Sequence, residues 1–481
     1  MSQLPNGWIN TSLGDVLAIR NGYAFKSTNF IEKGIPLVRQ ANLAGNTVDL
    51  TKAVYLPESF LEEYQRFKLQ SGDILMGMSG SIGKLCIYDQ DQIALQNQRT
   101  GKIELFSKSD ISERYVWHFL KTIESHLSDK AKGIAVANVS AGDIESTPFP
   151  LAPLNEQKRI ADKLDAVLVG VDACRERLDR VPAILKRFRQ SVLAAATSGK
   201  LTEEWRDANP SKVGAAQLVE KVHGAHESAG GHKAGNAAPP TEDVHDLSAD
   251  MFPHCWALLT LRDLVLPDRP ITYGILKPGP ELESGVSYVR VADFPNERLN
   301  LSTIRRTSRE IDQEFKRSRL RNGDLLLSIR GTVGRLIVIP VELDGANITQ
   351  DSARLSIQPS VNRDFVLWYL RSDLAQARMK DAIKGVAVRG INIGDVRALQ
   401  VPLPSREEQN EIVRRVEVLF AYADRLEARY TAARAQVERL TPALLAKAFR
   451  GELVPQDPND EPAAMLLERI RNEKENHRKQ K

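Results

Sequence analysis

Cysteine and long apolar runs are both scarce in this chain. Its three cysteines, Cys86, Cys174 and Cys255, stand too far apart in 481 residues to form a disulfide framework or a zinc site, which is typical of a reducing compartment. No apolar run approaches the roughly 20 residues that a membrane-spanning helix needs. The first residues lack the basic-then-apolar pattern of a secretory signal. The sequence therefore predicts a soluble, cytoplasmic protein.

Excess charge and recognisable enzyme motifs are lacking as well. The 66 basic and 62 acidic residues leave a formal net charge of +4, which is compatible with nucleic-acid binding but does not establish it. The segment from Gly77 to Lys84 is the nearest approach to a phosphate-binding loop, but it has five residues between its glycines and Leu85 after the lysine. We found no zinc-protease, dinucleotide-binding or methyltransferase motif. The sequence predicts a strand–turn–strand here, and neither a catalytic nor a metal site in the chain.

The clearest pattern that is present is a heptad run. Apolar residues recur from Ile160 to Val192 at alternating spacings of four and three, the pattern of a coiled coil, and the same run returns 252 residues later from Ile412 to Leu444. An apolar seam of this length would be costly to leave in water, so we expect the two helices to pair. The residues predicted to pair them are Ile160, Leu164, Val167, Val171, Leu178, Ile412, Val416, Leu419, Leu426 and Val437.

The repeat extends beyond the helices. Gly72-Asp73-Ile74-Leu75 returns as Gly323-Asp324-Leu325-Leu326, and Glu156-Gln157 returns as Glu408-Gln409, with an offset that stays between 248 and 252 along the chain. This constancy indicates a tandem duplication of a mixed α/β domain followed by a long helix. The predicted segments are a first domain at 1–152, a helix at 153–200, a linker at 201–250, a second domain at 251–403, a helix at 404–451 and a charged tail at 452–481.

Three details of this division are predictions of their own. Pro182 should kink or interrupt the first helix and Pro442 should break the second near its end, because proline lacks the N–H donor. The linker has little to bury, so its histidines, His223, His226 and His232, have no fixed scaffold for a metal. The charged tail should be a solvated helix face.

Basic and amide side chains recur at equivalent places in the two domains. Such side chains contact phosphates or read base edges, although any one of them could equally be an ordinary surface charge. The DNA-binding candidates are Lys26, Arg39, Lys84, Asn97, Gln98, Arg99 and Lys132 in the first domain, and Lys277, Arg290, Arg330, Arg335, Gln350, Lys384 and Arg389 in the second. The copies also differ, since Asn97-Gln98-Arg99 corresponds to Thr349-Gln350-Asp351, and the second domain adds a basic run between Arg305 and Arg321. Two different linings on one scaffold would suit two different DNA half-sites.

Several motifs together resemble one known family. They are Leu4-Pro5 with Gly7-Trp8, the paired Gly-Asp-(Ile/Leu)-Leu segments, the domain exits with Gly-(Ile/Val)-Ala-Val and Glu-Gln, and Leu444 to Leu453. In this order they resemble the specificity subunit of type I restriction–modification enzymes. Two departures are Cys255 before Trp256, where the family usually has glycine, and the long histidine-rich linker.

The resemblance implies an α+β fold in which two target recognition domains are joined by two long helices that form an antiparallel coiled coil. Each domain would read one half of a split DNA site. The helices would space the domains and dock two modification subunits, which hold S-adenosylmethionine and methylate adenine. Restriction subunits, which use ATP and magnesium, would then join. The chain itself would bind double-stranded DNA and no cofactor.

Two other classes of function stay open at this point. One is a self-contained nuclease or methyltransferase built from dispersed residues. The other is a coiled-coil DNA-binding scaffold or regulator that has no modification partners.

Overall fold

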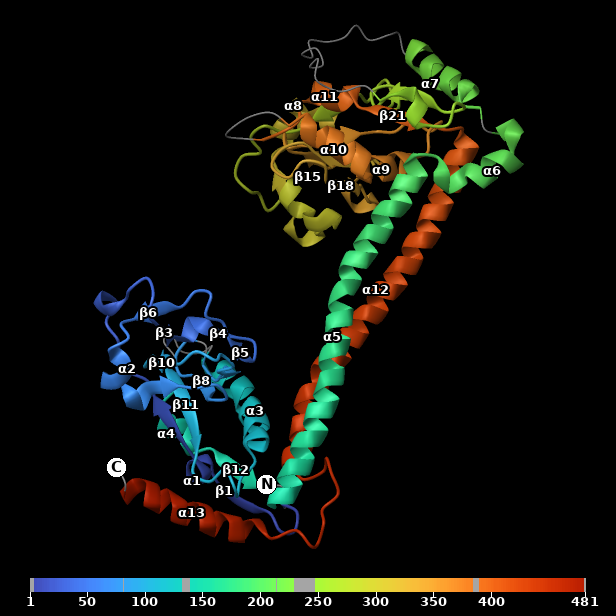
Figure 1. Cartoon of the computed structure of the whole chain (residues 1–481). Coiled ribbons are helices and arrows are strands. Elements are labelled where there is room, and N and C mark those ends of the chain that lie inside the picture. The colour runs from blue at the N-terminus through green and yellow to red at the C-terminus, as the bar shows by residue number, and fades with distance from the viewer. Residues whose placement is uncertain are drawn as a thin grey trace. The chain divides into compact units, whose positions relative to one another are not determined.

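The structure is a computed structural model that describes residues 4–80, 82–131, 139–212, 214–228, 247–383 and 389–479. The chain divides into two compact units, one made of Met1–Asp179 and Thr431–Lys481 and the other of Arg180–Tyr430. Each unit holds one mixed α/β domain and one part of each of two long helices (Figure 1). No helix in the described ranges combines the length and apolarity needed to cross a membrane.

The first domain consists of three sheets and short helices. Its first and last strands, β1 (Ile9–Ser12) and β12 (Pro148–Leu151), pair antiparallel and so bring the domain's entry and exit together. A six-stranded sheet has the order β2 (Leu17–Asn21), β11 (Thr100–Leu105), β8 (Ile74–Gly77), β9 (Leu85–Ile87), β5 (Thr47–Val48) and β4 (Leu43–Ala44). A four-stranded sheet has the order β6 (Val54–Leu56), β3 (Ile35–Val38), β10 (Ala94–Gln96) and β7 (Lys68–Leu69). The helices are α1 (Leu13–Val16), α2 (Phe60–Glu63), α3 (Glu113–Ala131) and α4 (Ala141–Glu145).

The second domain repeats this plan with fewer strands. Its entry and exit strands, β13 (Ala257–Thr260) and β21 (Gln400–Leu403), again pair antiparallel. One sheet has the order β14 (Thr272–Tyr273), β20 (Ser352–Leu355), β17 (Leu325–Ser328) and β18 (Leu336–Val338). The other has the order β16 (Arg305–Thr307), β15 (Val286–Val289) and β19 (Asn347–Ile348). The helices are α8 (Arg309–Glu314), α9 (Arg363–Arg371), α10 (Asp373–Asp381) and α11 (Ile393–Ala398).

The strand register confirms the duplication. Leu37 pairs with Leu95 in parallel in the first domain, and Tyr288 pairs with Asn347 in parallel in the second, at the offset seen in the sequence. The central strands β8 and β17 are apolar at successive positions because both of their faces are covered. In β17, Leu325 and Leu327 belong to one core while Leu326, which points to the opposite face, belongs to another.

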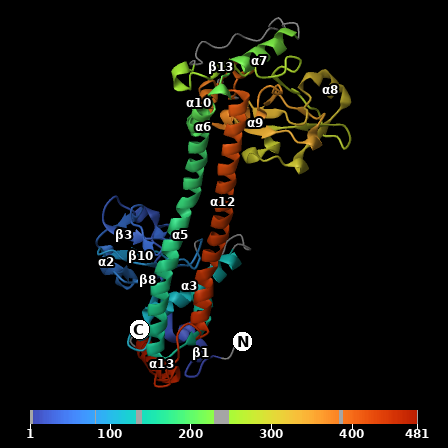
Figure 2. The same cartoon turned by 90° about the vertical axis from the view of Figure 1, so that its right-hand side faces the viewer.

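The two long helices are α5 (Leu154–Thr197) and α12 (Arg406–Phe449), each of 44 residues. In the first unit Arg175 bonds Thr441 and Asp179 bonds Arg434, and in the second unit Arg189 bonds Asp424 and Glu427. Numbers that rise along α5 fall along α12, so the helices pair antiparallel within each unit, as both views show (Figures 1 and 2). All ten residues predicted to pair the helices are buried or half-buried. Ile160 and Leu164, like Ile412 and Val416, also belong to the core of the adjoining domain.

The structure contradicts an interruption of the first helix at Pro182 and a break of the second at Pro442. Pro182 lies inside the continuous helix α5, and Pro442 lies inside α12, which ends seven residues later at Phe449. Both prolines are exposed, so water can reach the carbonyl group that each leaves without an N–H partner.

A buried indole–carboxylate bond joins each domain to the helix that follows it. Trp8 Nε1 donates to Glu156 Oε2 at 2.9 Å, and Trp256 Nε1 donates to Glu408 Oε2 at 3.0 Å. The carboxylates are almost inaccessible, at 1% and 0% exposure. Burial raises the pKa of Glu156, and the hydrogen bonds from Trp8 and Gln456 act in the opposite direction. The Trp and the Glu of the sequence motifs therefore bond each other and together form the junction between a domain and its long helix.

The glutamine after each glutamate completes the junction. Gln157 accepts a hydrogen bond from the Ser112 amide at 2.9 Å, just before α3, and Gln409 accepts one from the Asn362 amide at 2.7 Å, just before α9. The glycine that ends the opposite helix also packs here. A Cβ atom on Gly451 would lie 2.3 Å from Pro5 Cγ, so no other residue fits without a shift.

The linker and the tail differ from their predictions, because each contains a helix that packs on a domain. Helices α6 (Glu203–Ala208) and α7 (Ala216–Ser228) occupy part of the predicted linker, and α13 (Ala463–Lys479) occupies the predicted solvated tail. Leu218 and Val222 of α7 are buried in the core of the second domain, and Leu467 and Ile470 of α13 in that of the first. Charged residues of α13 also contact the first domain, where Arg469 pairs with Asp110 at 2.7 Å and Arg471 pairs with Asp15 at 3.3 Å.

These two helices are also copies of each other. The amide of Ala215 bonds the Cys255 carbonyl at 3.2 Å, and the amide of Ala463 bonds the Gly7 carbonyl at 2.8 Å. The offset of 248 between them holds from Ala215-Ala216-Gln217-Leu218 to Ala463-Ala464-Met465-Leu466. The tail therefore occupies, on the first domain, the place that α7 occupies on the second.

We expect Trp256→Phe to lower the stability of the chain by about 1–3 kcal/mol, because it strands the buried Glu408 carboxylate without its indole donor. Trp368→Phe is the matched control, since the Trp368 N–H has no hydrogen-bond partner in the described structure. Thermal unfolding of the full chain measures the difference. Equal losses of Tm in the two variants would show that ring packing, and not the hydrogen bond, is what matters.

We expect Leu467→Asp to release α13 from the first domain, because it places an unpaired carboxylate at a position that is 3% exposed. Met465→Asp, on the same helix but 49% exposed, should leave α13 in place. Limited proteolysis monitored by mass spectrometry would follow the release. Equal protection of residues 463–479 in both variants would contradict a packed tail.

Candidate nucleic-acid interface

Three loops of the first domain are fastened together at one end of its central strands. This first loop cluster comprises residues 22–27, 77–80 and 97–99. The Tyr23 amide bonds the Gln96 carbonyl at 3.0 Å, the Gln98 amide bonds the Tyr23 carbonyl at 3.1 Å, and the Met78 amide bonds the Arg99 carbonyl at 3.0 Å. Gly22 makes this approach possible, because a Cβ atom there would lie 2.3 Å from the Gln96 carbonyl oxygen.

The second domain has the same arrangement at the expected offset. The second loop cluster comprises residues 274–278, 328–331 and 349–351. The Gln350 amide bonds the Ile275 carbonyl at 2.9 Å, and the Ile329 amide bonds the Asp351 carbonyl at 2.8 Å. Gly274 is again required, since a Cβ atom would lie 1.9 Å from the Ile348 oxygen. The two clusters therefore share one backbone frame.

The side chains on the first loop cluster are partly those predicted. Lys26, Gln98 and Arg99 are exposed and so available to a ligand. Asn97 is only 7% exposed, and its Oδ1 accepts from the Arg99 amide, so it shapes the loop and does not face outward. The Lys84 Nζ donates to the Leu43 carbonyl at 2.5 Å, which ties it to the protein's own backbone.

The second loop cluster brings four of the predicted residues together. Arg330 Nη1 donates to Gln350 Oε1 at 2.8 Å, and Gln350 Nε2 reaches the Leu276 carbonyl at 3.4 Å, next to the exposed Lys277. The Gly331 amide bonds the carbonyl of Arg389, whose side chain is exposed. Arg330, Gln350, Lys277 and Arg389 therefore share one surface.

The other candidates lie outside the clusters. Arg290 pairs with Asp293 at 2.6 Å and donates to the Thr303 carbonyl, and hydrogen bonding to Asp293 raises its pKa. The Arg39 guanidinium lies 6.0 Å from the centre of the Phe30 ring, and Arg335 is half-buried at the end of its turn. Lys132 and Lys384 lie outside the described residues.

One exposed aromatic side chain was not predicted. Tyr23, in the first loop cluster, is 41% exposed, and its ring lies 4.7 Å from that of Tyr64 and 5.0 Å from that of Phe25. Its backbone forms an isolated bridge with Asn97. In the sequence Tyr23 directly follows Gly22, but nothing there separates it from Phe25, which is buried in a core cluster.

Two of the three linker histidines lie on a helix. His226 lies on α7, and its Nε2 is 2.9 Å from the Asp263 carbonyl oxygen. His223 lies on the same helix, whereas His232 is outside the described residues. Across the part of the chain that the structure describes, no three His, Cys, Asp or Glu side chains are arranged to hold a metal ion.

The comparisons with known proteins agree on one family. The family model described as the type I restriction modification DNA specificity domain matches residues 5–181 and again residues 279–433. The chain is 35% identical to the specificity subunit of the type I restriction enzyme EcoBI of Escherichia coli, over 98% of this chain and 93% of that one. It is 29% identical to the EcoKI specificity subunit of Escherichia coli strain K12, over 98% and 96%.

Two solved structures share the fold. One belongs to a study of complex assembly and conformational transition of the type I R-M system, with a TM-score of 0.58, 18% identity, and coverage of 94% of this chain and 100% of that one. The other is the HsdS subunit from Thermoanaerobacter tengcongensis, with a TM-score of 0.51, 20% identity, and coverage of 94% and 98%. The family match covers the first domain, most of the second domain and more than half of each long helix, so the chain belongs to the family of type I restriction–modification specificity subunits.

Proposed function

We propose that each loop cluster reads one half of a bipartite DNA site. The observation that carries this proposal is that the two clusters have the same backbone frame but differ in some of the side chains that they present. At equivalent positions the first presents Ser79 and Arg99, and the second presents Arg330 and Asp351. A common frame with separate linings is what independent readout of two different half-sites requires.

The second loop cluster is suited to direct readout. Arginine binds guanine O6 and N7 through two donors, and glutamine binds adenine N6 and N7 through one donor and one acceptor. Arg330 and Gln350 already bond each other, which holds both side chains in place before DNA arrives. The exposed Lys277 and Arg389 beside them would contact phosphates, which position a protein without reading sequence.

In the first loop cluster, Gln98 and Arg99 would contact base edges and Lys26 the backbone. The exposed ring of Tyr23 would add an apolar contact of the kind that thymine methyl groups accept. Lys84 and Arg290 lie outside the loop clusters and bond the protein itself, so this proposal assigns them no contact with DNA.

The chain is a non-catalytic specificity subunit, as its relatives are. Its partners would be double-stranded DNA, two modification subunits docked on the long helices, and restriction subunits. The modification subunits would hold S-adenosylmethionine, and the restriction subunits ATP and magnesium. The complex would act in the cytoplasm, where the DNA is. The regulator without modification partners is not favoured, because relatives along 98% of the chain are specificity subunits.

Exchanging residues 251–403 for the same region of a relative should change one half of the methylated sequence and leave the other half intact. The physical reason is that the second domain has its own core and its own loop cluster. Methylome sequencing of cells that supply the modification subunit measures both halves at once, with the parent chain as control. A change in both halves, or in neither, would count against independent readout. If cells with the parent chain show no methylation that depends on this chain, the proposed function is refuted.

Substitution of Arg330 by alanine should relax discrimination at one base pair of one half-site by about 1–3 kcal/mol. Arg309→Ala, which removes an exposed charge outside the loop cluster, should leave sequence preference unchanged. Binding of the assembled methyltransferase to a panel of single-base variants of its site measures the effect. If Arg330→Ala weakens all sequences equally, Arg330 is a phosphate contact and not a base reader.

A further inference from the structure

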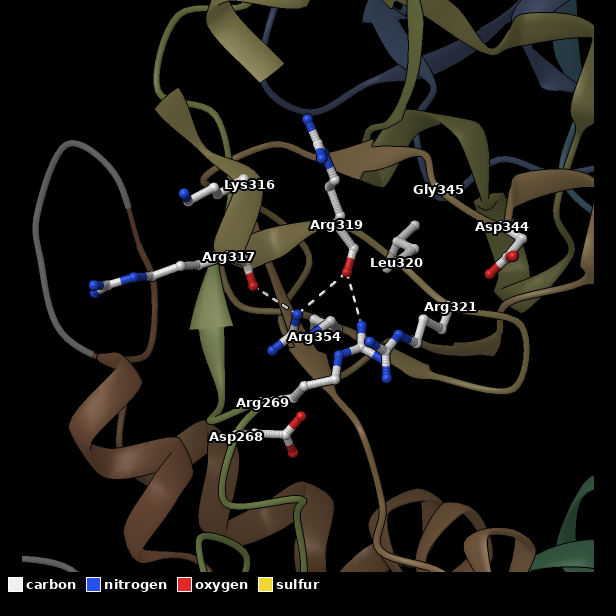
Figure 3. A pocket seen from close by; sticks show the side chains of 10 residues that line it. All are labelled: Asp268, Arg269, Lys316, Arg317, Arg319, Leu320, Arg321, Asp344, Gly345 and Arg354. Carbon is white, nitrogen blue, oxygen red and sulfur yellow. Dashed lines mark hydrogen bonds between the residues drawn. The ribbon is translucent and has the colours of Figure 1, made fainter. Parts of the chain in front are cut away.

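The second domain has a basic pocket of about 410 Å³ that the DNA-reading proposal does not use (Figure 3). Six of its lining residues are cationic and two are acidic. They are Arg269, Lys316, Arg317, Arg319, Arg321 and Arg354, with Asp268 and Asp344. These cations include part of the basic run that the sequence places ahead of Gly323. The pocket adjoins the start of β17, whereas the second loop cluster follows the end of that strand, so the two are separate places on the domain.

Arg354 is the unusual residue of this pocket. It is 2% exposed, yet it forms no ion pair within the described structure. Its guanidinium donates only to backbone carbonyls, at 2.6 Å from Arg317, 3.2 Å from Arg319 and 3.0 Å from Pro270, and its Nε has no partner. Carbonyl groups satisfy donors but do not neutralise charge. A buried positive charge without a counterion is costly unless an anion joins it.

The nearby carboxylate is already committed. Asp324 is bound by Arg269 at 2.9 Å and also accepts from the Ser356 hydroxyl and the Arg321 amide. Burial, together with the charges of Arg269 and Arg321, lowers the pKa of Arg354 to about 10, although the carboxylates of Asp324 and Asp268 act in the opposite direction. This pKa still leaves Arg354 protonated at neutral pH. The positive charges of Arg269, Arg321 and Arg354 therefore repel one another here, and Asp324 is the buried carboxylate among them.

The first domain supplies a comparison within the same chain. Asp73 corresponds to Asp324, and both accept a hydrogen bond from the amide three residues before them. Lys102, which corresponds to Arg354, pairs directly with Asp73 at 2.7 Å. Arg269 lies in a stretch of the second domain, between Val265 and Thr272, that is four residues longer than its counterpart between Leu17 and Arg20. The first domain is thus neutral at this place. The second has gained an arginine and left another without a counterion.

We propose that this pocket binds a phosphate-class oxyanion. Figure 3 shows the guanidinium groups of Arg269, Arg321 and Arg354 gathered at the centre of the view, while Lys316 and Arg317 extend away from them. Guanidinium groups present paired donors that match the oxygens of a phosphate. The anion is either a backbone phosphate of DNA or free phosphate. The first source rests on the proposed function and the second does not.

Arg321→Gln is the variant that tests the pocket, because Arg321 is exposed and its side chain has no partner in the described ranges, so the fold does not depend on it. Arg309→Gln is the control, an exposed arginine of the same domain that does not line the pocket. In the free full chain, we expect inorganic phosphate to raise the Tm by about 1–3 °C over chloride at equal ionic strength. Arg321→Gln should remove at least half of this shift, and Arg309→Gln should keep it.

DNA binding by the assembled methyltransferase identifies the source. For a backbone phosphate, Arg321→Gln weakens all sequences equally and lowers the slope of log K against log salt by about one, with Arg309→Gln unchanged. For free phosphate, the Tm response depends on Arg321 but the salt slope does not change. The proposal is overturned if neither readout responds to Arg321, or if phosphate stabilises both variants equally. A chain without sequence-specific DNA binding would refute the proposed function and leave the phosphate measurement valid.

Discussion

The bond between a buried indole and a buried carboxylate is the constraint on which each half of this molecule depends. Trp8 binds Glu156 and Trp256 binds Glu408, and each bond fixes the entry of a domain to the first turn of its exit helix. The adjacent glutamine, Gln157 or Gln409, accepts a hydrogen bond from the residue just before α3 or α9. In the first half, Gly451, which follows the end of α12, packs on the entry segment at Pro5. A carboxylate removed from water tolerates only partners in the correct geometry, so the junction admits one arrangement of these elements.

In this frame, the residues that hold the fold together are different from the side chains that the loop clusters present to a ligand. The loop clusters are fastened by backbone hydrogen bonds and by glycines that other residues could not replace without a shift, while some of their side chains differ between the copies. Serine stands at position 79 where arginine stands at 330, and arginine at 99 where aspartate stands at 351. A duplicated scaffold of this kind can change what it binds without changing how it folds. The basic pocket of the second domain is a further example, because one added arginine converts a neutral ion pair into an uncompensated positive site.

Errors in reading the sequence came from judging segments by composition alone. The linker and the tail looked polar, yet α7 and α13 each bury a stripe of apolar residues against a domain. Their constant offset of 248 was present in the sequence. The glycine- and histidine-rich residues that follow α7, however, made the whole segment look like a linker. Pro182 and Pro442 did not break their helices, because both are exposed and water can reach the carbonyl group that each leaves without an N–H partner. Lys84, Asn97 and Arg290 stay predictions, and the structure adds that each also bonds the protein itself.

The sequence by itself determined the duplication, the two long helices, the residues of their apolar seam and the family, because repeat offsets, heptad spacing and ordered motifs are properties of the chain alone. The tertiary structure decided which polar side chains are available to a ligand. Arg330 and Gln350 meet although 20 residues separate them, and Arg354 lacks a counterion because Arg269, 85 residues earlier, already holds Asp324. Charge and hydrogen bonding act over a few ångströms in space, and distance along a chain does not report that proximity.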